Sequence, residues 1–283
     1  MSLVYLNGAF LPLQQACIPV MDRGFIFGDA VYEVIPVYSG QPFRLEQHLV
    51  RLENSLTAVR IEVPFPRKQW RSLIGKIIAE NGGGDQSLYI QLSRGVTERD
   101  HVPAAAATTT VFIMSKPLQA CGSPEPVAAI VCPDFRWGRC DIKTTSLLAN
   151  VLLRYQAVDA GAWEAILVKD GWLTEGAASN VFVVDRGVIK TPPRGPHLLP
   201  GITRDLLVEM LRANDSSCAE TPVSEAELRQ AQEIWLTSST REIVPVVRLN
   251  QVPVGQGVPG PLWIKVNAMY QQAKQEWKSL GRS

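Results

Sequence analysis

The chain has 283 residues, of which 46% are hydrophobic and 19% charged, and its formal net charge is +1. This balance, without a basic block, disfavours nucleic acid as a partner, and no run reaches the roughly twenty apolar residues of a membrane span. The five cysteines are scattered and form no C-x-x-C pair, so neither a disulfide framework nor a metal site is expected. The first residues lack a basic segment followed by a cleavable apolar one, and we expect a cytoplasmic protein.

Residues 1–116 predict an α+β domain. A hairpin is expected first, because two short apolar segments flank Asn7-Gly8, a pair that favours a tight turn. Two later segments repeat apolar residues at helical spacing. The expected strands are residues 4–6, 9–11, 29–38, 88–93 and 110–115, and the expected helices are residues 45–59 and 68–80.

Residues 117–126 are a predicted linker, because prolines and a glycine interrupt any regular element there. Beyond it, residues 127–283 interleave strands and helices more regularly, which predicts an α/β domain. The expected strands are residues 127–132, 164–169, 180–185, 188–191, 233–237 and 244–249, and the expected helices are residues 147–159, 203–213, 225–231 and 261–279.

Lys143 is the candidate nucleophile. It lies between a strand-like and a helical segment, in partly apolar surroundings where we expect its ammonium group to be buried. Burial disfavours the charged form, and a neutral amine can condense with an aldehyde to give a Schiff base. Glu175 lies in a turn of small residues, and Thr203 lies at an expected helix start, where free N–H groups favour an anion. An amine, a carboxylate and an anion-binding helix start are the parts that a pyridoxal phosphate site needs.

Each signal also has a simpler interpretation when it is taken alone. Thr203 is then only a helix cap, and Ser239 belongs to a turn after an apolar strand. Arg99 and His101 lie two residues apart and suit a carboxylate, but the simpler interpretation is a solvated polar loop. His48 is then part of a surface or half-buried helical face. The order of the motifs along the chain is what separates these alternatives.

Five motifs occur in an order that resembles the fold-type IV pyridoxal phosphate enzymes, which include D-amino-acid transaminases, branched-chain transaminases and aminodeoxychorismate lyases. The resemblance covers nearly the whole chain. The motifs are Asp22-Arg23-Gly24-x-x-Phe27-Gly28-Asp29, His48-x-x-Arg51-Leu52, Ile142-Lys143, Thr174-Glu175-Gly176-x-x-x-Asn180 and Gly201-Ile202-Thr203-Arg204. The resemblance implies a small N-terminal α+β domain and a larger C-terminal domain whose mixed sheet forms a pseudo-barrel, with the cofactor bound by the latter.

Within that group the chain most resembles the D-amino-acid transaminases. Two segments distinguish it, Val31-Tyr32-Glu33-Val34 and Arg99-x-His101. The resemblance implies that Tyr32, Arg99 and His101 bind the substrate carboxylate, and that the last two reach in from the other subunit of a homodimer. Ser146 and Ser239 depart from the usual asparagine and threonine, but both keep a side chain that forms hydrogen bonds.

The resemblance also implies a role for each remaining site residue. Lys143 carries the cofactor and then acts as the general base, and Glu175 keeps the pyridine nitrogen protonated. Asn180 braces the segment around Glu175. The phosphate is bound by Arg51, Ile202, Thr203 and Ser239. The expected reaction is transamination of D-alanine or D-glutamate with 2-oxo acids.

Other activities on the same scaffold remain open. They are aminodeoxychorismate lyase, branched-chain transaminase and (R)-amine transaminase. Arg99 and His101 weigh against them. A more remote alternative is a pyridoxal phosphate-binding protein without turnover. A serine or cysteine hydrolase is disfavoured because the chain has no G-x-S-x-G motif.

Overall fold

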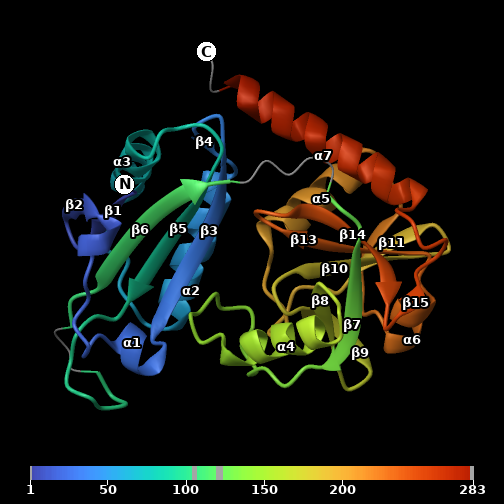
Figure 1. Cartoon of the computed structure of the whole chain (residues 1–283), viewed down its shortest axis with the longest axis horizontal. Helices are drawn as coiled ribbons and strands as arrows, with labels where there is room; N and C mark the ends of the chain where they lie inside the picture. The colour runs from blue at the N-terminus through green and yellow to red at the C-terminus, as the bar shows by residue number, and fades with distance from the viewer. Residues whose placement is uncertain (1, 104–106, 119–123, 281–283) are drawn as a thin grey trace. The chain divides into compact units, whose positions relative to one another are not determined.

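The computed structural model describes residues 2–103, 107–118 and 124–280 (Figure 1). The chain forms two compact units, which we call unit 1 and unit 2. Unit 1 comprises Met1–Ala120, Ile142–Ser146 and Trp277–Ser283, and unit 2 comprises Cys121–Asp141 and Leu147–Glu276. Residues 119–123 of the expected linker lie outside the described residues, so the domain boundaries stay a prediction.

Unit 1 is built on an antiparallel sheet of six strands. Asn7 and Gly8 both have positive φ, which gives the first hairpin the tight turn that its sequence predicts. In spatial order the strands are β2 (Ala9–Pro12), β1 (Leu3–Leu6), β6 (Thr110–Pro117), β5 (Gln86–Ser93), β3 (Ala30–Tyr38) and β4 (Gln41–Pro42).

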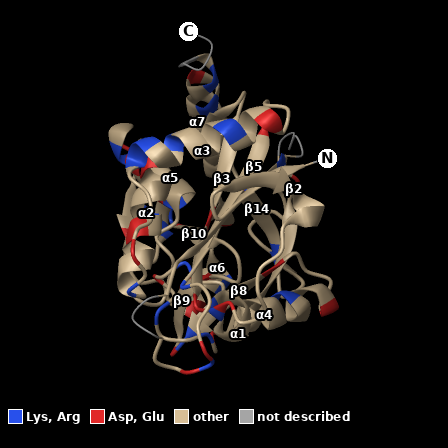
Figure 2. Ribbon diagram, turned by 90° about the vertical axis from the view of Figure 1, so that its left-hand side faces the viewer, with Lys and Arg blue, Asp and Glu red and all other residues tan. Residues whose placement is uncertain are grey.

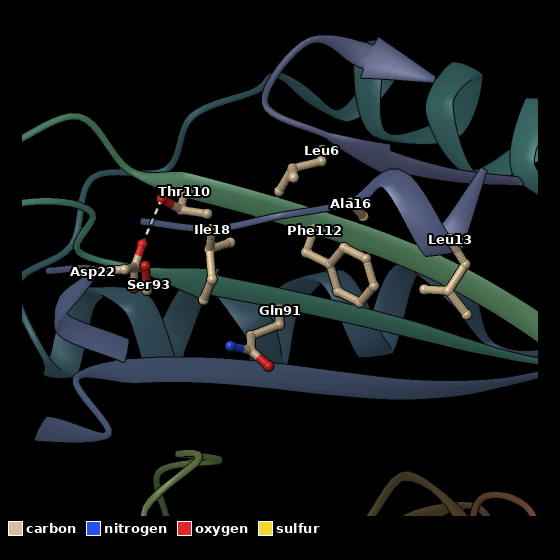
Figure 3. A pocket seen from close by; sticks show the side chains of 9 residues that line it. All are labelled: Leu6, Leu13, Ala16, Ile18, Asp22, Gln91, Ser93, Thr110 and Phe112. Carbon is tan, nitrogen blue, oxygen red and sulfur yellow. Dashed lines mark hydrogen bonds between the residues drawn. The ribbon is translucent and has the colours of Figure 1, made fainter. Parts of the chain in front are cut away.

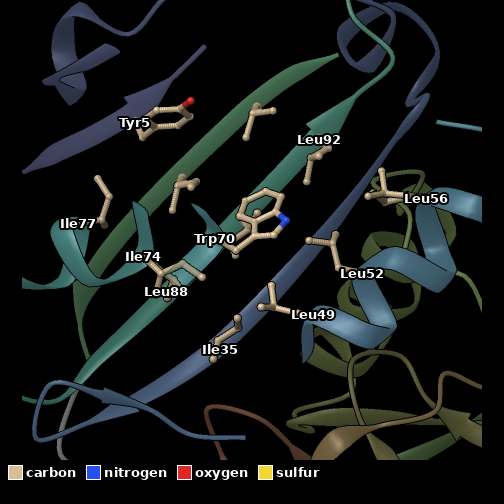
Figure 4. Packing of buried hydrophobic residues seen from close by; sticks show 14 of the residues in the cluster. Tyr5, Ile35, Leu49, Leu52, Leu56, Trp70, Ile74, Ile77, Leu88 and Leu92 are labelled. Carbon is tan, nitrogen blue, oxygen red and sulfur yellow. The ribbon is translucent and has the colours of Figure 1, made fainter. Parts of the chain in front are cut away.

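Two helices pack on one face of this sheet, α2 (Leu45–Ala58) and α3 (Arg67–Glu80). Leu49, Leu52 and Leu56 follow one another at spacings of three and four residues, so they share one side of α2. All three are buried and join Trp70 of α3 in the core (Figure 4). The helical spacing in the sequence therefore marks the buried side of α2 correctly.

The opposite face of the sheet carries a hollow of about 230 Å³ (Figure 3). Its residues on β5 and β6 alternate with residues of the core, as expected for side chains on the two faces of a strand. Asp22 lies at one end, where its carboxylate accepts a hydrogen bond from the Thr110 hydroxyl. The lining residues are Leu6, Leu13, Ala16, Ile18, Asp22, Gln91, Ser93, Thr110 and Phe112.

Unit 2 is built on a mixed sheet. The β14–β7, β7–β8 and β11–β12 pairs are parallel, and the other pairs are antiparallel. In spatial order the strands are β12 (Cys218–Glu220), β11 (Val188–Thr191), β10 (Asn180–Asp185), β13 (Glu233–Ser238), β14 (Glu242–Leu249), β7 (Val127–Pro133), β8 (Glu164–Lys169) and β9 (Trp172–Gly176), and β15 (Val252–Pro253) pairs with β14.

The sheet of unit 2 curls into a half-barrel, as the resemblance predicts. Leu173 of β9 shares one buried core with Val181 of β10 and Leu236 of β13, so distant strands of the sheet line the same interior. The outside is covered by α4 (Leu148–Asp159) and α5 (Ile202–Ala213), and α6 (Glu225–Gln230) contacts β9 and β10. Trp263 of α7 (Pro261–Leu280) donates through its indole N–H to the Ile243 carbonyl of β14.

One expectation about local structure is wrong. Glu175 lies in strand β9 and not in a turn. Pairing of β9 with β8 overrides the small-residue signal. Arg23–Phe27, within the first of the five motifs, forms a short helix, α1, that Asp22 caps.

Basic and acidic residues both occur along α7, as the blue and red parts of its ribbon show (Figure 2). Among the described helices none is long and apolar enough to span a bilayer.

We predict that Leu52→Ala lowers the free energy of unfolding by about 2–5 kcal/mol, because it leaves a cavity in the core of unit 1. Val50 lies on the same helix with 48% of its surface exposed, whereas Leu52 is 1% exposed. Val50→Ala is therefore the matched control and should change stability by less than about 1 kcal/mol. Urea unfolding followed by circular dichroism measures both, and equal losses would contradict this assignment of the core.

Candidate functional site

Lys143 is fixed to strand β3 by its backbone. The Tyr32 N–H donates to the Lys143 carbonyl at 3.0 Å, and the Thr145 N–H donates to the Ala30 carbonyl at 3.0 Å. The Lys143 N–H donates to the Ser55 hydroxyl of α2 at 3.3 Å. These bonds explain why Ile142–Ser146 belongs to unit 1 although its neighbours in the chain belong to unit 2.

The side chain of Lys143 lies on the ring of Tyr32. Its Nζ is 4.2 Å from the ring centroid, a cation–π distance. Lys143 is half-buried, so the expected burial of its ammonium group is met only in part. Tyr32 is half-buried too and packs on Tyr89 with ring centroids 5.7 Å apart. The amine is thus held by its backbone and by one aromatic face.

Arg51 belongs to a buried ionic cluster that we did not predict. Its guanidinium donates through Nε and Nη2 to the two carboxylate oxygens of Glu33, at 2.7 and 2.8 Å. His48 Nδ1 lies 2.7 Å from the same carboxylate. Glu33 is fully buried and His48 is 1% exposed, so the simpler interpretation of His48 as part of a surface or half-buried helical face is wrong.

Burial and the neighbouring charges shift the pKa of both Glu33 and His48. Burial raises the pKa of the Glu33 carboxyl, but the charge and hydrogen bonds of Arg51, together with His48, lower it to about 2. Burial lowers the pKa of His48, and Glu33 opposes that shift. Glu33 is therefore ionised at neutral pH and neutralises the charge of Arg51 inside the core.

Glu175 is the buried carboxylate of unit 2. Its Oε1 accepts from Arg136 Nη1 at 2.5 Å, and its Oε2 accepts from the Leu199 N–H at 3.0 Å and from Asn180 Nδ2 at 3.2 Å. Asn180 also donates to the Leu199 carbonyl, so it connects two segments around the acid. Asn180 therefore lies where a bracing residue is expected.

Arg136, like Glu33, is a residue of the candidate site that the sequence did not lead us to expect. Its guanidinium also donates to Asp134 at 2.8 Å, and Asp134 in turn accepts from the Thr174 hydroxyl at 2.7 Å. Burial raises the pKa of Glu175 to about 7, while Arg136 and the Leu199 N–H lower it. Removing Arg136 would leave the carboxyl with a still higher pKa.

The first turn of α5 has the features of an anion site. Gly201 is its N-cap and supplies no capping side chain, and Ile202 and Thr203 are buried. Thr203 therefore does not cap the helix, contrary to the simpler interpretation. A methyl group at Gly201 would collide with the side-chain oxygen of Asn180, so the backbone approaches closely there. Ser239, half-buried, lies in the turn after β13.

Arg99 and His101 lie on an exposed loop of unit 1. The guanidinium of Arg99 is 5.4 Å from the centroid of the Phe27 ring, and the ring of His101 is 5.7 Å from it. The two side chains thus converge on one aromatic ring. Tyr32 instead contacts Lys143 and Tyr89.

Comparison with known proteins identifies the family. Residues 30–249 match the family described as Amino-transferase class IV. The chain belongs to this family. Among curated relatives of this aminotransferase, the D-alanine aminotransferase of Bacillus licheniformis is 37% identical over 275 residues, covering 95% of this chain and 96% of the relative. That of Listeria monocytogenes is 33% identical over 272 residues, covering 94% of each chain.

Solved structures share the fold of this class IV aminotransferase. The branched-chain amino acid aminotransferase of Escherichia coli superposes with a TM-score of 0.89 at 26% identity, covering 96% of this chain and 94% of that one. A second branched-chain amino acid aminotransferase, complexed with N-(5'-phosphopyridoxyl)-L-glutamate, gives 0.88 at 26% identity, covering 96% and 93%. The predicted family and two-sheet fold are thereby confirmed.

Class IV aminotransferases use pyridoxal phosphate, and the residues described above fit that group. Unit 1 offers a half-buried primary amine, Lys143, beside an aromatic face. Unit 2 offers a buried carboxylate, Glu175, held by three donors, and a helix start whose N-cap brings no side chain. These are the groups that an aldehyde, a pyridine nitrogen and a phosphate require.

We predict that Glu33→Gln lowers the free energy of unfolding at pH 7 by about 3–5 kcal/mol, because it leaves the buried Arg51 without its counter-charge. Below pH 4.5 the unfolded chain takes up a proton at Glu33 while the folded protein does not until about pH 2. The parent should therefore lose about 3 kcal/mol more stability than the variant across that window.

Urea titrations at pH 7 and pH 2 measure this loss. The control is Glu53 of α2, the helix that carries Arg51. Glu53 pairs with Arg67 in a partly exposed ion pair, and Glu53→Gln should lower the free energy of unfolding by less than about 1 kcal/mol. Equal effects of the two substitutions would contradict the role of the buried cluster.

Proposed function

We propose that this protein is a D-amino-acid transaminase that moves the amino group of D-alanine or D-glutamate to a 2-oxo acid. The observation that supports this most is the similarity to curated relatives, together with three residues that distinguish this group. Curated relatives with the name D-alanine aminotransferase are 32–37% identical over more than nine tenths of the chain. The chain also carries Tyr32, Arg99 and His101, the residues expected to bind the substrate carboxylate.

The matched solved structures favour a second candidate. Several carry the name branched-chain amino acid aminotransferase, with TM-scores up to 0.89. Their identity to this chain is 24–26%, below that of the D-alanine relatives. Because one fold supports many activities, we give the sequence relationship more weight than the superposition.

Pyridoxal phosphate, when bound, supplies an aldehyde for covalent attachment and a ring that accepts the electrons released at the substrate Cα. In the proposal Lys143 would hold this group covalently through Nζ, and the same amine would serve as the base for the substrate Cα proton. The Glu175 carboxylate would keep a proton at the pyridine nitrogen, and Arg136 and Asn180 fix the two carboxylate oxygens.

The proposed phosphate ligands are the backbone N–H groups and the hydroxyl at the start of α5, the Ser239 hydroxyl, and the Arg51 guanidinium. Arg51 is held by the buried Glu33, which fixes the orientation of its planar fork. Such pre-ordering lowers the entropic cost of binding an anion. Tyr32, Arg99 and His101 would orient the substrate so that its Cα–H faces Lys143.

The first test is covalent labelling and turnover. We predict that Lys143→Ala abolishes conversion of D-alanine and 2-oxoglutarate to pyruvate and glutamate, because both the covalent link and the general base are lost. Borohydride reduction of the loaded parent protein, followed by peptide mapping, should label Lys143. Lys116 is an exposed residue of unit 1, so Lys116→Ala is the control and should keep parental activity.

The amino donor in the same assay separates the two candidates. Turnover of D-alanine without turnover of L-leucine or L-alanine is expected. The reverse preference would contradict the proposed D-specificity and favour the branched-chain alternative.

We also propose that the protein acts as a homodimer in which Arg99 and His101 are supplied by the partner. Helix α4 exposes an apolar stripe that supports self-association. Its residues recur at helical spacing and each is at least 46% exposed, which is unusual for a monomer surface. They are Leu148, Val151, Leu152, Tyr155 and Val158.

We predict that Leu148→Glu combined with Tyr155→Glu weakens the dimer about a hundredfold or more, because each apolar side chain contributes about 1.5–3 kcal/mol when buried. Sedimentation equilibrium measures the change. Val252→Glu alters a residue of β15 that is 64% exposed and should leave the dimer intact. If the double variant sediments with the same dimer mass and the same dissociation constant as the parent, the assignment of α4 to the interface is contradicted.

A further inference from the structure

Helix α1 is a short helix of unit 1 that is held in place by its N-cap and by close packing; we call it the platform helix. Asp22 caps it by accepting from the Gly24 N–H at 2.8 Å, and its other oxygen accepts from the Thr110 hydroxyl at 2.7 Å. A methyl group at Gly24 would lie 2.7 Å from the Cβ of Ser93, so α1 presses closely on β5. Gly28 ends the helix with a φ of 65°, a conformation that favours glycine.

Arg23 of the platform helix forms hydrogen bonds with the loop that carries Arg99 and His101. It is 4% exposed, and its Nε donates to Asp29 at 2.8 Å. The two other guanidinium nitrogens donate to consecutive loop carbonyls, those of Asp100 and His101. A single planar guanidinium thus fixes the two peptide units that flank His101.

Phe27 of the same helix supports the side chains of that loop. The guanidinium groups of Arg23 and Arg99 lie 4.8 and 5.4 Å from its ring centroid, and the His101 ring lies 5.7 Å from it. Arg99 and His101 are exposed, so without support each would lose side-chain freedom on binding a ligand. Contacts with one ring restrict both before a ligand arrives.

Asp29 completes the support. Its carboxylate also accepts from Arg94, at 2.8 and 3.0 Å, and Arg94 donates to the carbonyls of Val59 and Arg60 after α2. The Arg23 N–H donates to the Gly95 carbonyl at 2.9 Å. The loop is therefore attached to α1 at Gly95 and again at Asp100 and His101, and Arg94 attaches it to the segment after α2.

We propose that Arg23 and Phe27 are positioning residues that hold Arg99 and His101 as a preformed pair for the substrate carboxylate. This inference deepens the proposed function and rests on it. Neither residue touches the substrate. Each lowers the conformational cost of binding, Arg23 through the loop backbone and Phe27 through the two side chains.

The test is a double-mutant cycle on kcat/KM for D-alanine in the loaded full-length protein. Phe27→Leu should lower kcat/KM about five- to tenfold, mainly by raising KM, with the cofactor absorbance unchanged. In the Arg99→Ala/His101→Ala background the same substitution should change kcat/KM less than twofold, because residues that act through one another are not additive. Phe27→Tyr keeps the aromatic face and should restore the parental value.

Two further variants guard against a merely structural effect. Phe25→Leu alters the same helix at a side chain that is 70% exposed and should keep parental kcat/KM. Arg23→Lys keeps a charge beside Asp29 but loses the fork to two carbonyls, and it should also lower kcat/KM about five- to tenfold.

The outcomes separate the inference from the function on which it rests. If Phe27→Leu lowers kcat/KM equally in both backgrounds, or in neither, the positioning role is overturned while the proposed function stands. If Arg99→Ala/His101→Ala itself leaves kcat/KM at the parental value, the carboxylate assignment is overturned and the positioning role with it.

Discussion

The attachment of Ile142–Ser146 to strand β3 is the constraint on which the proposed chemistry depends. Two backbone hydrogen bonds, from Tyr32 to the Lys143 carbonyl and from Thr145 to the Ala30 carbonyl, make Lys143 part of unit 1. The backbone of Lys143 is anchored in this way, while its amine lies against the Tyr32 ring. That combination suits the roles proposed for this amine, a covalent anchor and a proton carrier.

A second constraint is the buried ionic cluster of unit 1. Glu33 lies on the core side of β3 and is paired with Arg51 and His48 of α2. A buried ion pair contributes little net stability compared with apolar packing, but it fixes the geometry of its members. Here it orients the guanidinium of Arg51, the residue proposed to bind phosphate. Unit 1 thus uses buried charge to orient a binding group.

Much of the fold follows from the sequence because periodicity and turn residues act locally. The spacing of Leu49, Leu52 and Leu56 and the Asn7-Gly8 turn identify α2 and the first hairpin directly. The assignment of Glu175 to a turn fails because small residues also occur in a strand that bends. Its pairing with β8 is a long-range property that no local pattern contains.

The sequence also points to part of the candidate site. Motif order singles out Lys143 and Glu175 as candidates, and their roles stay a prediction. Glu33 had a usable signal, since a charged residue at an inward position of an apolar strand needs a partner. Arg136 had none, because it meets Glu175 only through the folded sheet, 39 residues away in sequence.

The close approach of Gly201 to Asn180 has a consequence for evolution and for engineering. Asn180 touches both the start of α5 and the carboxylate of Glu175, so one amide side chain connects these two segments of unit 2. A larger residue at 201 would push that amide away and so disturb the acid as well. Libraries that diversify this corner should therefore vary both positions jointly, since beneficial changes there are expected to be epistatic.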